Sequence, residues 1–179
     1  KLGIPTMRDR IAQEVVRDYM EKRIDTQFHE NSYGYRPMKS AHDALRQVRE
    51  NVLEKDWVVD MDISKFFDEI DHELMLKAVD AMLGEKWVKM YVKRWLEMKV
   101  ETTDGEVELS RGKGTPQGGV ISPLLANLYL HYTLDQWLDT HYPTVSFVRY
   151  ADDIVLHCKT EEEARQLLIS LGERLTQVK

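Results

Sequence analysis

Residues 145–159 read VSFVRYADDIVLHCK, two runs rich in β-branched and aromatic residues that flank the turn Tyr150-Ala151-Asp152-Asp153. Such runs are typical of strands, and the short break between them indicates a β-hairpin. Two carboxylates held this close at a hairpin tip repel each other unless a cation lies between them. Mg²⁺ prefers carboxylate oxygens and completes its shell with water and phosphate oxygens. The stretch therefore predicts a metal-binding hairpin, with a plain acidic β-turn as the alternative.

A second acidic strand is predicted at Trp57-Val58-Val59-Asp60-Met61-Asp62-Ile63. Side chains alternate along a strand, so Asp60 and Asp62 share one face. An Asp at the end of one strand, placed beside an Asp pair on a hairpin, is the ligand set of a two-metal phosphoryl-transfer site. The alternative is an exposed acidic strand edge.

A glycine-rich loop lies between these acids, with the sequence GKGTPQGG at residues 112–119. Glycines let a backbone approach a ligand closely, so the loop is a candidate nucleotide contact. It is not a Walker A sequence, and a flexible connection is the alternative. Ser122 and Pro123 then begin a helix. Its apolar stripe at helical spacing comprises Leu124, Leu125, Leu128, Tyr129, Tyr132, Leu134 and Leu138.

The rest of the chain predicts helices and one further hairpin. Periodicity and caps place helices at about 7–24, 40–53, 71–77, 85–97 and 160–176. In the first of these, Ile11, Val15, Val16 and Tyr19 fall near one face. Asp104-Gly105 between two short strands is a strong two-residue hairpin signal. Together the elements predict an α+β fold with a small antiparallel sheet backed by helices.

Five ordered blocks carry a resemblance to a known family. They are LGIPTMRDRIAQ at 2–13, FHENSYGYRP at 28–37 with SAHD at 40–43, DMDISKFFDEIDH at 60–72, GTPQGGVISPLLAN at 114–127, and YADD at 150–153. The chain resembles, nearly end to end, the fingers and palm of a group II intron-encoded reverse transcriptase, or maturase. The resemblance implies a right-hand polymerase palm with mostly helical fingers and a thumb outside this chain. The expected division is fingers at 1–56, palm at 57–82, an insertion at 83–119 with a β-hairpin at 99–110, and palm again at 120–179.

The resemblance also implies roles for individual residues. Asp62, Asp152 and Asp153 match the three catalytic, metal-binding carboxylates, and the backbone of Ile63 is expected beside them near the triphosphate. Phe67 matches the aromatic ring that excludes a 2′-hydroxyl, and Gln117 matches a contact to the incoming nucleotide. Since neighbouring side chains cannot both face the nucleotide, one of Phe66 and Phe67 must belong to the core. The remaining expected nucleic-acid contacts are Tyr33, Tyr35 and Arg36 for the RNA template, and Tyr150 beneath the primer terminus.

The implied activity is RNA-directed DNA synthesis, in which a DNA primer is extended with dNTPs on an RNA template. The implied cofactor is a pair of Mg²⁺ ions, for which Mn²⁺ can substitute, and group II intron RNA is an implied partner through a role in splicing. A retron or diversity-generating reverse transcriptase, a splicing cofactor without catalysis, and a nucleotidyl cyclase with a similar palm are the alternatives. A fragment without a thumb grips its duplex poorly, so activity of the fragment alone is doubtful.

Composition sets limits on these interpretations. The chain has 179 residues, 42% of them hydrophobic, which suits a folded core. No apolar run is long enough for a membrane span, and no signal peptide opens the sequence, so a cytoplasmic protein is expected. The single cysteine, Cys158, excludes an internal disulfide. The net charge is −6, yet residues 1–49 carry +3, which leaves −9 on the rest. A homodimer is a further expected state.

Overall fold

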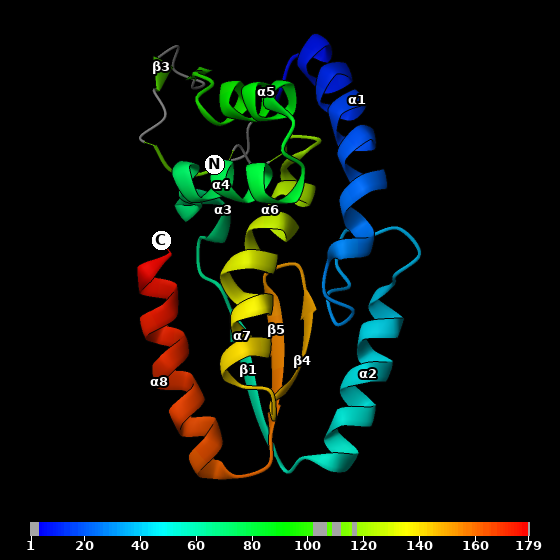
Figure 1. Ribbon diagram of the computed structural model, residues 1–179, viewed down its shortest axis with the longest axis vertical. Coiled ribbons are helices and arrows are strands. Elements are labelled where there is room, and N and C mark those ends of the chain that lie inside the picture. Colours follow the sequence, from blue (N-terminus) through cyan, green and yellow to red (C-terminus); the bar gives the residue numbers. More distant parts are fainter. Residues whose placement is uncertain (1–3, 102–106, 109–111, 116–117, 179) are drawn as a thin grey trace. The chain divides into compact units, whose positions relative to one another are not determined.

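The computed structural model describes residues 4–101, 107–108, 112–115 and 118–178 (Figure 1). Its helices and strands in chain order are α1 (Met7–Ile24), the 3₁₀ helix η1 (Asp25–Gln27), α2 (Ala41–Glu54), β1 (Trp57–Asp62), α3 (Phe66–Glu69), α4 (His72–Met82), α5 (Lys86–Leu96), β2 (Val100–Glu101), β3 (Val107–Glu108), α6 (Ser122–Leu130), the π-helix η2 (His131–Asp135), α7 (Gln136–His141), β4 (Ser146–Tyr150), β5 (Asp153–Cys158) and α8 (Glu161–Gln177). The predicted α+β class is confirmed.

Backbone contacts divide the chain into two compact units. The first unit joins Lys1–Gln27 to Lys65–Tyr129, and the second joins Phe28–Ser64 to Leu130–Lys179. Each unit is therefore assembled from two stretches that are distant in sequence. All three predicted catalytic carboxylates belong to the second unit.

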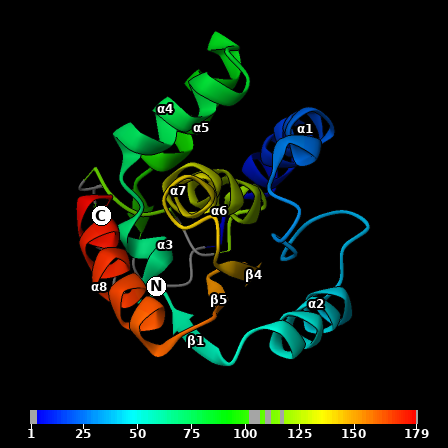
Figure 2. The same cartoon turned by 60° about the horizontal axis from the view of Figure 1, so that its bottom comes forward.

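The second unit is built on a three-stranded antiparallel sheet in the order β1-β5-β4. The predicted hairpin supplies β4 and β5, which pair with each other, and the predicted acidic strand is β1, which pairs with β5 (Figure 2). Strand β5 lies in the centre, and Ile154, Leu156 and Cys158 along it are fully buried. These three side chains lie on the sheet face opposite Asp153 and form part of the core of this unit.

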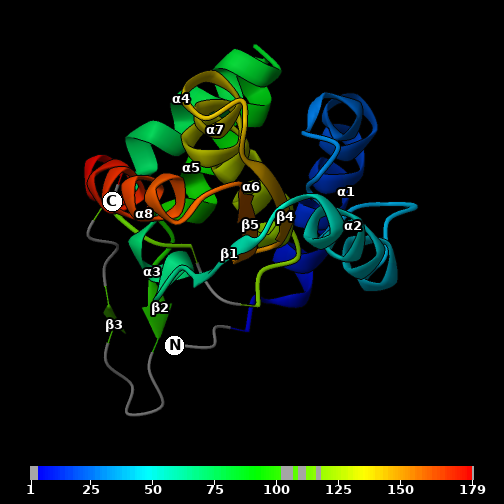
Figure 3. The same ribbon diagram turned by 90° about the horizontal axis from the view of Figure 1, so that it is seen from below.

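Two helices flank this sheet, as Figure 2 and Figure 3 show. Helix α2 contacts β4 and β5, and helix α8 contacts β1 and β5. On the α2 side, Val148 of β4 forms a small buried cluster with Tyr33 and Ala44. Val148 pairs with Val155, which lies two positions after Asp153 on β5. Because side chains alternate along a strand and paired residues share a face, Val148 and Asp153 lie on the same face of the sheet. Helix α2 therefore covers part of the face that carries the acidic residues.

The helix ends follow the sequence signals closely. Ser40 accepts a hydrogen bond from the Asp43 N–H while the Asp43 carboxylate accepts one from Ser40, a complete capping box. Asp71 caps α4 through the Leu74 N–H at 2.8 Å. Thr160 caps α8 through the Glu163 N–H at 3.2 Å. Within the described ranges, no helix combines the length and the apolar character needed to cross a bilayer.

The apolar face predicted for α1 is wrong in part, because Val16 is buried but Ile11 and Val15 are not. Ile11 and Val15 are each 63% exposed, whereas Gln13 is almost fully buried in the same helix. The Gln13 side-chain carbonyl accepts a hydrogen bond from the Val120 N–H at 2.8 Å, just before α6 begins. This bond satisfies a backbone donor near a helix start, which explains why a polar residue occupies the buried stripe.

The predicted hairpin around residue 104 is described only in part. Strands β2 and β3 pair antiparallel, with Val100 opposite Glu108 and Glu101 opposite Val107. The turn residues Asp104 and Gly105 lie outside the described residues.

Replacing His157 with Leu is expected to reduce the acid sensitivity of folding. His157 is fully buried, and burial lowers the pKa of its imidazole. As pH falls below about 6.5, this imidazole becomes protonated in the unfolded chain but stays neutral in the folded protein. The free energy of unfolding therefore decreases with falling pH until the lowered folded-state pKa is reached. Urea unfolding at neutral and mildly acidic pH measures the effect, with the exposed His42→Leu as control. Equal acid sensitivity in both variants would refute this origin.

Candidate active site

The acidic strand and the acidic hairpin meet at one end of the sheet. Asp62, the last residue of β1, lies directly opposite Asp153, the first residue of β5. Residues directly opposite each other in an antiparallel pair have Cβ atoms about 4.5–5.5 Å apart on the same face. The expected contact between strand β1 and the hairpin is thereby confirmed. Two positions earlier in β1, Asp60 faces the same side, opposite Val155.

The hairpin tip is a tight turn with an unusual backbone. Tyr150 pairs with Asp153, which leaves Ala151 and Asp152 as the two turn residues. Ala151 has a φ of 57°, in the left-handed region that residues with a side chain rarely enter. The first position of such a two-residue turn usually favours glycine. Strain of this kind, about 1–3 kcal/mol, persists where surrounding contacts hold the backbone.

The electrostatic environment of Asp152 is unfavourable for its charge. Burial raises the pKa of the Asp152 carboxyl above its ordinary value, and the negative charges of Asp153 and Asp62 raise it further. A backbone hydrogen bond opposes these effects only in part. A cation at this position would relieve both the burial cost and the repulsion.

A buried ion pair supports the turn from the opposite sheet face. Arg149 and Asp135 of η2 are both fully buried and form a bidentate pair, at 2.8 Å from Nε and 2.6 Å from Nη2. The remaining terminal nitrogen, Nη1, donates to the Ala151 carbonyl at 3.1 Å. The guanidinium therefore fixes a main-chain atom of the strained turn residue.

A loop from the predicted RNA-contact region also packs against this turn. The Arg149 N–H donates to the Asn31 carbonyl at 2.8 Å, and the Tyr33 N–H donates to the Arg149 carbonyl at 2.8 Å. Gly34 follows, and a Cβ added there would lie 2.4 Å from the Ala151 nitrogen. No real Cβ tolerates such a contact with backbone, so only glycine fits this approach.

The donor set suits a hard cation. Within the described ranges, no group of three or more His, Cys, Asp or Glu side chains is already arranged around a common metal position. The structure does place Asp62, Asp152 and Asp153 at one sheet end, and all their donor atoms are carboxylate oxygens, which Mg²⁺ prefers. The raised pKa of Asp152 is the observation that fits a cation here.

The first unit contains the residues predicted to contact the nucleotide sugar. Phe66 is 7% exposed and packs against Tyr129 with ring centroids 6.3 Å apart, so it is the core member of the Phe66–Phe67 pair. Phe67 is only half-buried. The glycine-rich loop is anchored beside it, because the Thr115 N–H donates to the Phe67 carbonyl at 2.7 Å. Gln117 lies outside the described residues.

The predicted RNA contacts differ in accessibility. Tyr35 is 55% exposed and Tyr150 is 38% exposed, so both rings offer surface to a base or sugar. Tyr33 is buried. The Arg36 guanidinium donates to the carbonyls of His29 and Ser32, which uses part of its hydrogen-bonding capacity within the loop.

Three supporting residues were not singled out from the sequence, namely Arg149, Asp135 and Gly34. A signal was present for the ion pair, because each charged residue interrupts an otherwise largely apolar stretch. Buried charges are rare unless they are paired. Gly34 lies in the segment FHENSYGYRP at residues 28–37, but the sequence does not show which other segment of the chain approaches it.

Comparisons with known proteins agree with this arrangement. Residues 1–179 match the family model described as "Reverse transcriptase (RNA-dependent DNA polymerase)". Protein YkfC of Escherichia coli (strain K12) is 33% identical over 194 residues, which cover 88% of this chain and 50% of YkfC. The group II intron-encoded protein LtrA of Lactococcus lactis subsp. cremoris is 35% identical over 130 residues, which cover 73% of this chain and 21% of LtrA. The chain thus spans about half of one relative and a fifth of the other.

Solved structures share the fold. A truncated apo telomerase from Candida Tropicalis superimposes with a TM-score of 0.69 at 12% identity, covering 95% of this chain and 38% of the telomerase chain. A telomerase from Candida albicans, solved with a fragment of telomeric RNA, gives a TM-score of 0.67 at 13% identity, covering 96% of this chain and 33% of that telomerase chain. At these identities the likeness concerns the fold alone. The match of the family model to residues 1–179 shows that the chain belongs to the reverse transcriptase (RNA-dependent DNA polymerase) family.

Proposed function

We propose that this chain is the fingers and palm part of a group II intron reverse transcriptase, which extends a DNA primer with dNTPs on an RNA template. The observation that carries the proposal is the position of Asp62 opposite Asp153, with Asp152 in the adjoining turn. The group II assignment is supported by relatives that are intron-encoded proteins. In the proposed division, residues 1–56 are fingers, 57–82 and 120–179 are palm, and 83–119 are an insertion.

Reverse transcriptases generally use divalent metal ions. In this chain, the carboxylates of Asp62, Asp152 and Asp153 and the backbone of Ile63 would hold two Mg²⁺ ions, or Mn²⁺ in their place. When bound, such ions activate the attacking primer 3′-hydroxyl and stabilise the leaving pyrophosphate.

The protein's own contribution is positioning and charge. Asp62 and Asp153 present exposed carboxylates from paired strands, so their separation is set by the β-ladder rather than by a flexible loop. Asp152 depends on the turn, which the Arg149 guanidinium holds through the Ala151 carbonyl. Tyr150 lies on the same face as Asp153 and is proposed to support the primer terminus. Fixed geometry of this kind is the main source of rate in phosphoryl transfer.

Replacing Phe67 with Ala is expected to weaken selection against ribonucleotides. The half-buried Phe67 ring is proposed to lie beneath the incoming sugar, where it leaves no room for a 2′-hydroxyl. Single-nucleotide incorporation with a dNTP and the matching rNTP measures discrimination as a ratio of kcat/KM values. Phe66→Leu, which changes the neighbouring core ring, is the control. Unchanged discrimination in Phe67→Ala would refute the assignment.

RNA template, DNA primer and dNTPs are the proposed substrates, and group II intron RNA is a further proposed partner. Gln117 is proposed to contact the incoming nucleotide, and Tyr33, Tyr35 and Arg36 the template. A splicing cofactor without catalysis is the second candidate, but the presence of all three carboxylates favours an active polymerase. A homodimer would double the mass measured by light scattering.

Primer extension on an RNA template by the full-length protein tests the proposal. DNA product is expected with Mg²⁺ and not after chelation. Release of cyclic nucleotide without primer extension would identify a cyclase instead.

A further inference from the structure

The first residue of α4, His72, places its imidazole against the glycine-rich loop of the first unit. The residue is buried, with 6% of its surface exposed. Its Nε2 atom lies 2.6 Å from the carbonyl oxygen of Gly114. Because a carbonyl oxygen can only accept a hydrogen bond, Nε2 carries the proton and donates it. The imidazole therefore fixes one main-chain atom of the loop.

The carbonyl that accepts from His72 belongs to the peptide group joining Gly114 to Thr115. The N–H of this same group, on Thr115, donates to the Phe67 carbonyl at 2.7 Å. A peptide group is planar and stiff, so its two ends move together. One rigid group is thus held by the imidazole and itself holds the main chain of Phe67. A shift at His72 would therefore be passed on to Phe67.

The turn that carries Phe67 needs support from outside itself. Helix α3, Phe66–Glu69, is a single turn, and one turn of helix is not stable alone. Its N-cap residue is Lys65, whose ammonium group cannot accept a hydrogen bond from the first N–H groups. Carbonyls at the end of a helix also need donors from elsewhere. The loop supplies them, because the Gly114 N–H donates to the Ile70 carbonyl at 2.8 Å and the Thr115 N–H to Phe67.

The loop lies too close to α3 for any side chain at residue 114. Gly114 has a φ of 83°, and a Cβ added there would lie 3.0 Å from the Asp68 carbonyl oxygen. Glycine alone suits both conditions. An exposed ion pair between Lys113 and Glu69, at 3.5 Å, adds a weaker link. The loop and the α3 turn are therefore packed main chain against main chain, so a displacement of one displaces the other.

We infer that His72 is a positioning residue for sugar selection. Through the Gly114–Thr115 peptide group, its imidazole sets the position of Phe67, the ring proposed to exclude a 2′-hydroxyl. The inference rests on the proposed function, which supplies the role of Phe67. Groups that select a substrate have to be held within about 0.5 Å of their working position, and a single uncapped turn does not hold a ring that well by itself.

Two replacements of His72 in the full-length protein test the inference. His72→Leu removes the donor and is expected to lower the ratio of kcat/KM values for a dNTP and the matching rNTP by about tenfold, the lower end of what one steric contact contributes to discrimination. His72→Gln keeps an N–H donor and is expected to retain the ratio. Partial unfolding lowers both kcat/KM values equally, so a merely structural role would leave their ratio unchanged.

A double-variant cycle with Phe67→Ala shows whether His72 acts through the ring. Once the ring is absent, adding His72→Leu is expected to change the ratio no further. An equal effect of His72→Leu with and without the ring would overturn the inference. A ratio left unchanged by His72→Leu in the presence of the ring would do the same.

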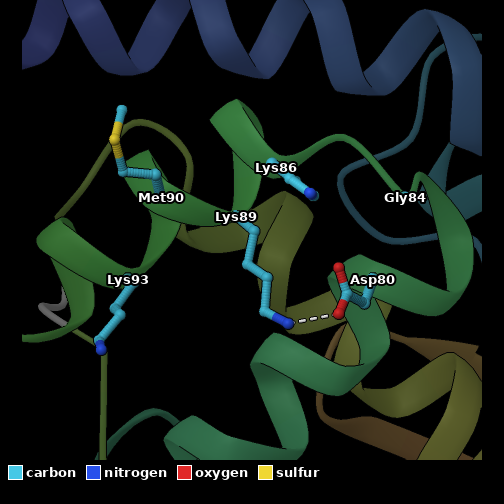
Figure 4. Close-up of a pocket in the computed structure, with 6 residues that line it drawn as sticks. All are labelled: Asp80, Gly84, Lys86, Lys89, Met90 and Lys93. Atoms are coloured by element: carbon cyan, nitrogen blue, oxygen red, sulfur yellow. Dashed lines mark hydrogen bonds and ion pairs between the residues drawn. The ribbon is translucent and has the colours of Figure 1, made fainter.

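Gly114→Ala disturbs the same contact from the loop side, and it keeps the test decisive if His72→Leu does not fold. It is expected to lower the ratio as well, and an unchanged ratio would contradict the inference. The matched control is Gly84→Ala. Gly84 also has a positive φ, 74°, but a Cβ there would meet only the Asp80 carbonyl, at 3.9 Å. It lines a separate pocket formed with residues of α4 and α5 (Figure 4), so the control is expected to keep the ratio.

Failure of this inference differs from failure of the proposed function. If Phe67→Ala lowers the ratio and His72→Leu does not, the inference is overturned while the proposed function stands. If Phe67→Ala leaves the ratio unchanged, the role of the ring is refuted and the inference with it. If the unchanged protein extends no primer on RNA, the proposed function itself fails.

Discussion

Replacing Asp152 with Asn is expected to reduce primer extension by about a thousandfold, the scale seen when one preorganised charge-stabilising group is removed. The metal-free protein is expected to become more stable, not less. Burial and the charges of Asp153 and Asp62 raise the pKa of Asp152, so the folded state disfavours its ionised form. A carboxyl whose pKa is raised in the folded state contributes less to the free energy of unfolding as pH rises through that pKa, because the folded protein then carries a charge that it disfavours. An amide does not ionise and avoids this loss.

Two measurements on the same sample check this prediction. Primer extension gives the activity, and thermal unfolding with and without Mg²⁺ gives the stability. Asp56→Asn is a suitable control, because Asp56 is exposed and lies six residues before Asp62, about 20 Å away along an extended strand. Mg²⁺ should stabilise the control more than Asp152→Asn. Near-normal extension by Asp152→Asn would contradict the proposed mechanism.

Replacing Arg149 with Met is expected to cost about 3–5 kcal/mol of folding free energy, since it leaves Asp135 buried without its partner. Urea unfolding measures the loss. Adding Asp135→Leu is expected to recover much of it, because replacing a whole buried pair with apolar residues is far less costly than breaking it.

Activity should not recover in the double variant. Both variants lack the guanidinium that binds the Ala151 carbonyl, so the turn carrying Asp152 remains less well fixed. Primer extension by the double variant is therefore expected to stay well below that of the unchanged protein, with a higher Mg²⁺ concentration needed for half-maximal rate. Full recovery of both stability and rate would show that the ion pair serves the fold alone.

Local signals predicted most of this fold. The cap residues Ser40, Asp71 and Thr160 mark helix starts that the structure confirms, because each satisfies backbone donors within its own first turn. The strand pattern around Asp62 and the Tyr150 hairpin likewise depend on nearest neighbours in sequence. The contact between those two elements was predicted through the requirements of metal chemistry and is confirmed by the β-ladder.

Other features could not be derived from local patterns. Gln13 is buried because the N–H of Val120, more than a hundred positions away, needs an acceptor. Periodicity alone therefore placed two exposed residues, Ile11 and Val15, on the apolar face of α1. The pairing of Arg149 with Asp135 depends on how η2 packs against the sheet, which the sequence leaves open.

The tight approach of Gly34 to the Ala151 nitrogen restricts how the acidic hairpin of this chain can be moved into another protein. The hairpin tip and the loop that ends at Gly34 share a surface with no space for even one methyl group. An engineer who grafts the acidic hairpin into a different scaffold would need to transfer that loop with it. The unit of modular exchange is thus two segments, separated by more than a hundred residues, that must be moved together.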